Sequence, residues 1–124
     1  VHNFVLQAVF EAQPAPAEEM ERLLEAARAR RKLSQPVGAS AGCIFKNPPE
    51  IPAGKLIDEL GLKGACVGDA CVSDVHANFI INRGHARARD ITILIDMIRK
   101  EAMENRGIDL KSEAQVIGDR DPQF

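Results

Sequence analysis

Residues 34–53 form the segment that most constrains what this chain can fold into. They hold too many chain-breaking residues for a long helix or a central strand. These residues are Pro36, Gly38, Gly42, Pro48, Pro49 and Pro52. We therefore expect a structured loop here, with a short strand at residues 43–46. Long ordered loops in compact domains often carry function; the alternative is a surface connection that happens to contain one cysteine.

The residues before this loop predict one strand and one helix. Residues 3–11 alternate between apolar and polar side chains, which predicts a strand with one buried face. The residues of that face are Phe4, Leu6, Ala8 and Phe10. Residues 17–32 predict a helix, because Pro16 is suited to open it and glutamates fill its first turns. Its apolar face, which we expect to belong to the core, consists of Met20, Leu23, Leu24 and Ala27.

The residues after the loop predict short elements in a mixed order. In chain order these are a helix at 53–60 closed by Gly61, strands at 65–67, from 70 onward and at 78–82, a helix at 89–105 and a strand at 114–117. The long helix has an apolar face at helical spacing, made of Ile91, Leu94, Ile95, Ile98 and Met103. Without a strict βαβ repeat, this order predicts the α+β class, a small mixed sheet packed with about three helices.

Length and composition favour one globular domain over residues 1–124. A chain of 124 residues with 45% hydrophobic and 27% charged residues can bury a single core. Val1 is not a methionine and lies where a strand is expected, so we expect residues 1–16 to be the end of a preceding domain and residues 119–124 to be a frayed tail.

The same composition excludes several kinds of partner. Aromatic residues are only 4%, with no Trp or Tyr, and the net charge is -2, which argues against stacking on nucleic-acid bases. No apolar run is long enough to cross a membrane, and no signal-peptide pattern opens the chain. We expect a cytoplasmic protein that binds neither nucleic acid nor membrane.

The three cysteines are an odd number, which argues against a disulfide framework and fits a reducing compartment. A five-residue interval separates Cys66 from Cys71 and Cys71 from His76, which could suggest a metal-binding site. Zinc sites usually offer closer pairs and four ligands, so we predict no metal and interpret these cysteines as buried, inert thiols.

The candidate site lies within the loop, in the stretch SAGCIFKNP at residues 40–48. Ser40 and Gly42 are small and let a backbone approach a ligand closely. Cys43 has an acidic proton to give, while Lys46 can hold an anion and Asn47 a polar ring.

Further polar residues stand next to expected strands. Glu113 lies at the mouth of the last strand and offers a carboxylate. His76 and Asn78 precede the strand at 78–82, where such side chains either satisfy a turn or face a cleft. The chain has no GxGxxG, phosphate-loop or HExxH pattern, so it offers no obvious cradle of its own for a flavin or a nucleotide.

Four motifs in this order carry a resemblance to a known family. They are SAGCIFKNP, AGKLIDELGLKG, VSDVHANFIINRGHARARDI and GIDLKSEAQVIG. Together they resemble the carboxyl-terminal domain of UDP-N-acetylenolpyruvoylglucosamine reductase, from about Gln35 to Gly118. The strand and helix before this stretch resemble the family more weakly.

The resemblance implies a cytoplasmic flavoenzyme of peptidoglycan synthesis. In that family NADPH reduces a bound FAD, and UDP-N-acetylglucosamine enolpyruvate is reduced to UDP-N-acetylmuramate. The FAD would lie in amino-terminal FAD-binding domains that are missing from this sequence, so we expect no cofactor to be bound by this chain alone. The chain would be the third, substrate-binding domain and would be inactive by itself.

The resemblance also implies roles for residues. The family usually has a serine, the acid that protonates the substrate carbon, where this chain has Cys43, and a glutamate that stabilises the intermediate at Glu113. Lys46 and Asn47 match the family's KNP motif and would hold the UDP part, with His76 and Asn78 supporting the pocket wall.

This sequence departs from the family's pattern at two places. A thiol at position 43 is more acidic than a hydroxyl, and we expect Cys43 to act as the neutral thiol although Lys46 could favour thiolate. Asp69 stands in a stretch where the family commonly shows Gly and Gln, and we expect its carboxylate to point away from a diphosphate.

Two readings from other classes remain open. One is a stand-alone UDP-sugar-binding module without redox activity, which predicts measurable UDP-sugar binding by the 124-residue chain. The other is a structural domain that uses its three thiols for redox or metal binding, which an elemental and thiol assay would detect.

Overall fold

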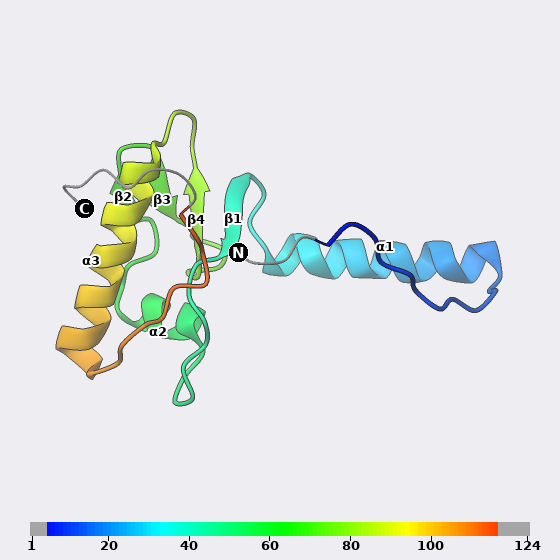
Figure 1. Ribbon diagram of the computed structural model, residues 1–124, viewed down its shortest axis with the longest axis horizontal. Coiled ribbons are helices and arrows are strands. Elements are labelled where there is room, and N and C mark those ends of the chain that lie inside the picture. Colours follow the sequence, from blue (N-terminus) through cyan, green and yellow to red (C-terminus); the bar gives the residue numbers. More distant parts are fainter. Residues whose placement is uncertain (1–4, 117–124) are drawn as a thin grey trace. The chain divides into compact units, whose positions relative to one another are not determined.

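The computed structural model describes residues 5–116, which fall into two compact units, Val1–Arg31 and Lys32–Phe124. The first unit contains most of helix α1, Ala17–Ser34, which closely matches the predicted helix (Figure 1). The second unit contains all the strands and the two other helices. Each unit is described by itself.

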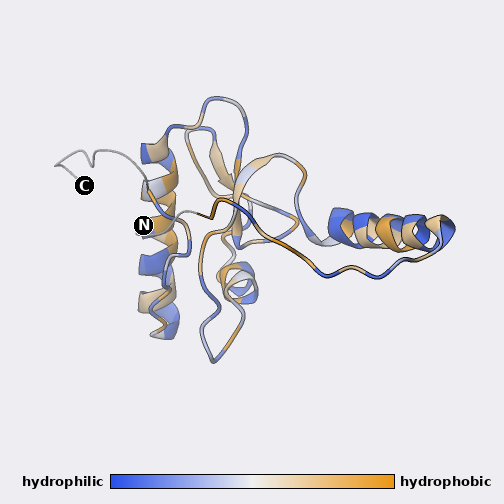
Figure 2. Cartoon of the chain, turned by 45° about the vertical axis from the view of Figure 1, so that its right-hand side comes forward, coloured by the Kyte–Doolittle hydropathy of each residue, from blue (hydrophilic) through white to orange (hydrophobic). Residues whose placement is uncertain are grey.

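The first unit corrects two predictions. Residues 5–11 form no strand, and their large apolar side chains are exposed, because no described residue pairs with their backbone; Phe4 lies outside the described residues. Helix α1 buries none of its residues. Its apolar residues colour parts of the ribbon orange in Figure 2. The side chains of Met20 and Leu23 are about half exposed, so the face predicted to belong to the core is uncovered in the described residues.

The second unit is built on a four-stranded antiparallel sheet with the order β1-β4-β3-β2. Its strands are β1 Ala39–Cys43, β2 Cys66–Val67, β3 Ala70–Val72 and β4 Phe79–Asn82. β2 to β4 fall where the sequence predicts them. The α+β class is therefore confirmed, and the three helices of the described residues are the predicted number. The sheet was predicted to be mixed, but all its strand pairs are antiparallel.

β1 begins earlier than the strand predicted at residues 43–46. It pairs with β4 through Ala39 and Ser40, and again at Cys43, with an irregularity between these contacts. Gly42, whose φ of 81° suits glycine, lies within this irregularity. Beyond it, Phe45 makes only an isolated bridge to Ser112.

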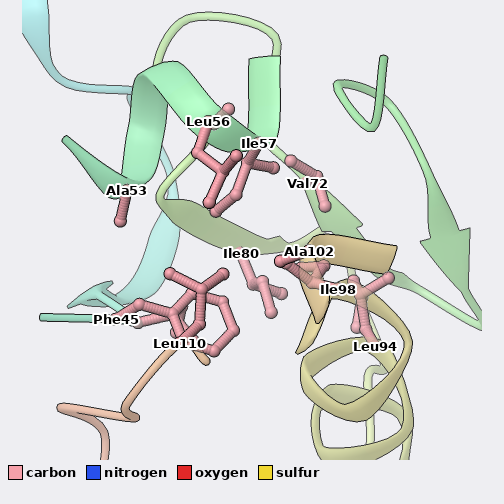
Figure 3. Packing of buried hydrophobic residues seen from close by; sticks show 13 residues of the cluster. Phe45, Ala53, Leu56, Ile57, Val72, Ile80, Leu94, Ile98, Ala102 and Leu110 are labelled. Atoms are coloured by element: carbon pink, nitrogen blue, oxygen red, sulfur yellow. The ribbon is translucent and has the colours of Figure 1, made fainter. Parts of the chain in front are cut away.

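Helices α2, Ala53–Glu59, and α3, Ala88–Arg106, pack against the sheet and each other. Figure 3 shows their buried side chains meeting those of the sheet and of the loop. The largest fully buried ones are Phe45, Ile44, Leu56, Ile57, Leu94, Ile98, Leu110 and Val72. Met103 was predicted to lie on the buried face of α3, but its side chain is 47% exposed. The residue at this end of the helix that faces the core is Ala102, which is fully buried.

The hairpin β2–β3 corrects the prediction of inert thiols. Cys66 and Cys71 lie directly opposite each other, with Cα atoms 4.1 Å apart, and form a disulfide. Cys66 is exposed, whereas Cys71 is buried. An odd number of cysteines argues only against a chain-wide framework, and it misses a local pair that a hairpin register creates.

The segment after α3 returns to the loop. α3 ends at Arg106 and is capped by Gly107, which has a left-handed φ of 66°. Residues 114–116 form no strand: beyond the bridge between Phe45 and Ser112, the Glu113 and Ala114 amides both donate to the Ile44 carbonyl, and no regular ladder follows in the described residues. Ile117 and the predicted frayed tail, residues 119–124, lie outside the described residues.

Candidate functional site

An open cleft of about 320 Å³ lies between the loop, α2 and the β3–β4 turn. It contains four of the predicted site residues, Cys43, Asn47, His76 and Asn78. The other lining residues are Pro52, Gly54, Lys55, Asp58, Lys63, Val75 and Ala77. Residues that are far apart in the sequence therefore share one concave surface.

Cys43 stands at the end of β1, outside any disulfide. Partial burial raises the pKa of its thiol, and the negative charge of Glu113 raises this pKa further. The thiol therefore holds its proton to a higher pH than an ordinary cysteine does.

Glu113 reaches Cys43 from the far end of the chain through backbone pairing. The Glu113 amide donates to the Ile44 carbonyl at 2.7 Å, and the Lys46 amide donates to the Lys111 carbonyl at 2.9 Å. This pairing fixes the carboxylate close enough to act on the thiol, although Glu113 does not line the cleft. The structure thus brings the Cys43 thiol and the Glu113 carboxylate close to each other.

Asn78 holds the loop in place. Its buried carboxamide accepts a hydrogen bond from the Phe45 amide at 2.9 Å and donates one to the Phe45 carbonyl at 2.8 Å. These two hydrogen bonds take the place of strand pairing at Phe45, which lies between Cys43 and Asn47 in the sequence. Since both ends of the carboxamide are engaged, Asn78 acts on the cleft through the backbone of Phe45.

Asn47 connects the loop to α2. Its carboxamide oxygen accepts a hydrogen bond from the Ala53 amide at 3.0 Å, which satisfies one of the backbone donors at the start of the helix. The carboxamide nitrogen keeps its two hydrogens for other partners. Asn47 can therefore both order the loop and donate to a ligand.

His76 is held on two sides. Its Nδ1 accepts a hydrogen bond from the Asn78 amide at 3.2 Å, which leaves the ring proton of the neutral form on Nε2. The ring also packs edge-on against Phe79, with centroids 5.0 Å apart. His76 thus satisfies the turn and lines the cleft, the two roles that the sequence left open.

The predicted residues Ser40, Gly42 and Lys46 do not line the cleft. Ser40 lies opposite Ile81 in the sheet, and Lys46 is exposed. Asp69 is also absent from the lining; its carboxylate accepts a hydrogen bond from the His85 amide at 2.8 Å, consistent with the expectation that it points away.

The sequence interpretation missed two cations of the cleft. Lys55 and Lys63 line it, with Lys63 2.7 Å from the Asp58 carboxylate and Lys55 3.8 Å from Glu59. The available signal was the spacing of Lys55 and Asp58, which are three residues apart and so share one face of a helix that begins directly after the loop. Asp58 also lines the cleft and offsets one of the two ammonium charges, and the net positive charge that remains, with an amide donor, suits an anionic ligand.

No cluster of three or more metal-ligating side chains occurs in residues 5–116. Cys66 and Cys71 belong to the hairpin, whereas His76 belongs to the cleft. Across the same residues, no helix is long and apolar enough to cross a membrane.

These features define an α+β domain with a thiol-containing cleft. The sequence profile of the UDP-N-acetylenolpyruvoylglucosamine reductase C-terminal domain matches residues 31–117. The chain belongs to this family.

Curated relatives and a solved structure agree with this assignment. A UDP-N-acetylenolpyruvoylglucosamine reductase of Syntrophobacter fumaroxidans is 45% identical over 91% of this chain and 33% of its own length. One from Moorella thermoacetica is 46% identical over 96% of this chain and 38% of its own length. The crystal structure of the Thermus caldophilus reductase matches with a TM-score of 0.67 and 46% identity, covering 83% of this chain and 36% of that one. The chain thus spans somewhat more than a third of the length of most of these relatives.

Proposed function

We propose that this chain is the substrate-binding third domain of a flavin-dependent oxidoreductase. The enzyme reduces UDP-N-acetylglucosamine enolpyruvate to UDP-N-acetylmuramate with NADPH, in the cytoplasm, for cell-wall synthesis. Membership of the reductase family supports the reaction, and the relatives' greater length supports amino-terminal FAD-binding domains as the partners of this one. The observation that carries the proposal is the Cys43 thiol, held protonated within a cleft that can bind an anion.

Cys43 supplies the proton that this reduction needs. Hydride addition to the outer carbon of the enolpyruvyl double bond leaves negative charge on the inner carbon, delocalised into the carboxylate. Transfer of the Cys43 proton to that carbon completes the reduced product and leaves a thiolate that regains a proton from solvent. The raised pKa keeps Cys43 protonated at neutral pH, and the negative charge of Glu113 contributes to that raised pKa.

The remaining cleft residues hold the substrate. Lys55 and Lys63 supply positive charge for the diphosphate, and Asn47 supplies an amide donor. Lys46, Ser40 and Gly42 do not line the cleft in this chain, so contacts from them require the rest of the site to close over the loop.

The residues described in this chain do not fit a bound flavin. The cleft carries polar and charged groups, and no glycine-rich loop precedes any of the helices in residues 5–116. FAD, reduced by NADPH, would supply the hydride from the amino-terminal domains. The contribution of this chain is the binding of substrate and the holding of a proton.

Substitution of Cys43 in the complete gene product tests the proposal. We expect Cys43→Ala to lower the rate of substrate reduction by about 10²- to 10⁴-fold, the usual worth of a positioned acid. Flavin reduction by NADPH, followed by stopped-flow absorbance, should keep its rate. Cys43→Ser should retain much of the activity, since a hydroxyl can also give a proton.

A matched control is Glu50→Gln, which changes an exposed residue of the same loop outside the cleft and should leave both rates unchanged. Unchanged substrate reduction in Cys43→Ala would remove Cys43 from the acid role. A wild-type protein that binds UDP-sugar but has no bound flavin and no reductase activity would favour the stand-alone binding module.

A further inference from the structure

Gly54 in α2 has no conformational reason to be glycine. Its φ lies outside the left-handed region, whereas most glycines of the described chain lie within it. Glycine is also a poorer helix residue than alanine. The reason for a missing side chain must therefore be space.

The space next to Gly54 is filled by His76. A Cβ at position 54 would lie 2.8 Å from the His76 Cε1, 3.2 Å from its Nδ1 and 3.6 Å from the Asn78 Cβ. The first of these distances is shorter than real Cβ contacts allow, so the imidazole would have to move.

His76 cannot move without losing its present contacts. The Asn78 amide holds Nδ1, and Phe79 packs against the ring edge-on. The backbone at Gly54 also lies against the ring, and both Gly54 and His76 line the cleft. The ring would therefore be displaced within the cleft and would carry its Nε2 donor with it.

We propose that Gly54 is a positioning residue of the cleft, because its missing side chain lets the His76 imidazole rest against α2. This contact fixes both the width of the cleft and the place of a ring donor for the nucleotide part of the substrate. The inference rests on the proposed function, since it takes the ligand to be a uridine nucleotide.

A double-mutant cycle in the complete gene product tests this role, with UDP as the probe and calorimetry as the measurement. We expect Gly54→Ala to weaken UDP binding by about tenfold or more, the loss expected when a placed donor is displaced. In the His76→Ala background the same substitution should cost nothing further, because the clashing ring is gone. Gly84→Ala, the same change outside the cleft and without a positive φ, should leave UDP affinity unchanged.

Thermal unfolding of the same four proteins reports the contact without any ligand. Gly54→Ala should raise the unfolding midpoint in the His76→Ala background, where only helix propensity acts, and should fail to raise it when His76 is present. Normal UDP affinity in Gly54→Ala, or losses from Gly54→Ala and His76→Ala that multiply, would overturn the inference and leave the proposed function standing. A wild-type protein that does not bind UDP would overturn the proposed function and the role of Gly54 in it, while the unfolding cycle would still decide whether the two residues touch.

Discussion

At the residue scale, the reactive group of this chain is controlled by a residue seventy positions away. The thiol of Cys43 lies at the end of β1, and the Glu113 carboxylate follows the last helix. Their proximity raises the pKa of Cys43, in addition to the effect of partial burial. Charge and burial act in the same direction, so both favour the protonated donor.

Removal of the Glu113 charge should make Cys43 more acidic. In Glu113→Gln the negative neighbour that disfavours thiolate is gone, so the pKa of Cys43 falls and the thiolate fraction at neutral pH rises. We expect iodoacetamide to alkylate Cys43 faster at pH 7 and the midpoint of the rate against pH to shift to lower pH. Peptide mass spectrometry measures this site separately from Cys66 and Cys71.

The control for this experiment is Glu104→Gln, an exposed carboxylate of α3 outside the cleft, which should leave the alkylation profile unchanged. An unchanged or higher midpoint in Glu113→Gln would contradict the interaction between the two residues.

The sequence predicted the types of site residue better than their tasks. Cys43, Asn47 and His76 line one cleft. Asn78 lines it too, but its carboxamide makes both of its hydrogen bonds to the backbone of Phe45. Lys55 and Lys63 were not predicted. A motif specifies residue types along the chain. It does not specify which hydrogen-bonding groups of a side chain bind other residues of the fold and are therefore not free to bind a ligand.

At the element scale, helix α3 shows how far periodicity can predict burial. Leu94 and Ile98 are fully buried as predicted, and the capping residues Asp90 and Gly107 have the expected geometry. Met103 is the exception at 47% exposure. One residue of error at a helix end is a rotation of about 100° about the axis, which is enough to turn a side chain from core to solvent.

Truncation of two apolar side chains of α3 should therefore have very different effects. Ile98→Ala should cost about 2–5 kcal/mol of unfolding free energy, because Ile98 is 1% exposed and leaves a cavity. Met103→Ala, on the same helix, should change the unfolding free energy by no more than about 0.5 kcal/mol, as surface substitutions do. Urea unfolding followed by circular dichroism measures both, and equal losses would contradict the assigned burial.

The strands and their pairing were predicted less well than the helices. A helix satisfies its backbone internally, so propensity and periodicity carry most of the signal. A strand needs a partner: residues 5–11 alternate correctly yet find none in the described chain, while Cys66 and Cys71 meet only because the hairpin aligns them.

At the scale of the whole molecule, the core lies within the second unit. All buried residues of the described chain lie beyond Ser34, and α1 contributes none. A chain lacking residues 1–31 should therefore unfold cooperatively at nearly the same midpoint as the 124-residue chain. Differential scanning calorimetry of the two proteins measures this, and loss of the transition on truncation would place residues before Lys32 in the folding core.

The helices, the α+β class and the family follow from the sequence alone, because periodicity, breakers and ordered motifs are local properties of the chain. The assembly of the site is visible only in the folded chain. Glu113 lies near Cys43, and His76 lies against Gly54, because of contacts between residues that are distant in the sequence. Helix α1 is exposed because no such contacts cover it in the described residues. Such contacts are set by packing and backbone pairing across the fold, and no local pattern encodes them.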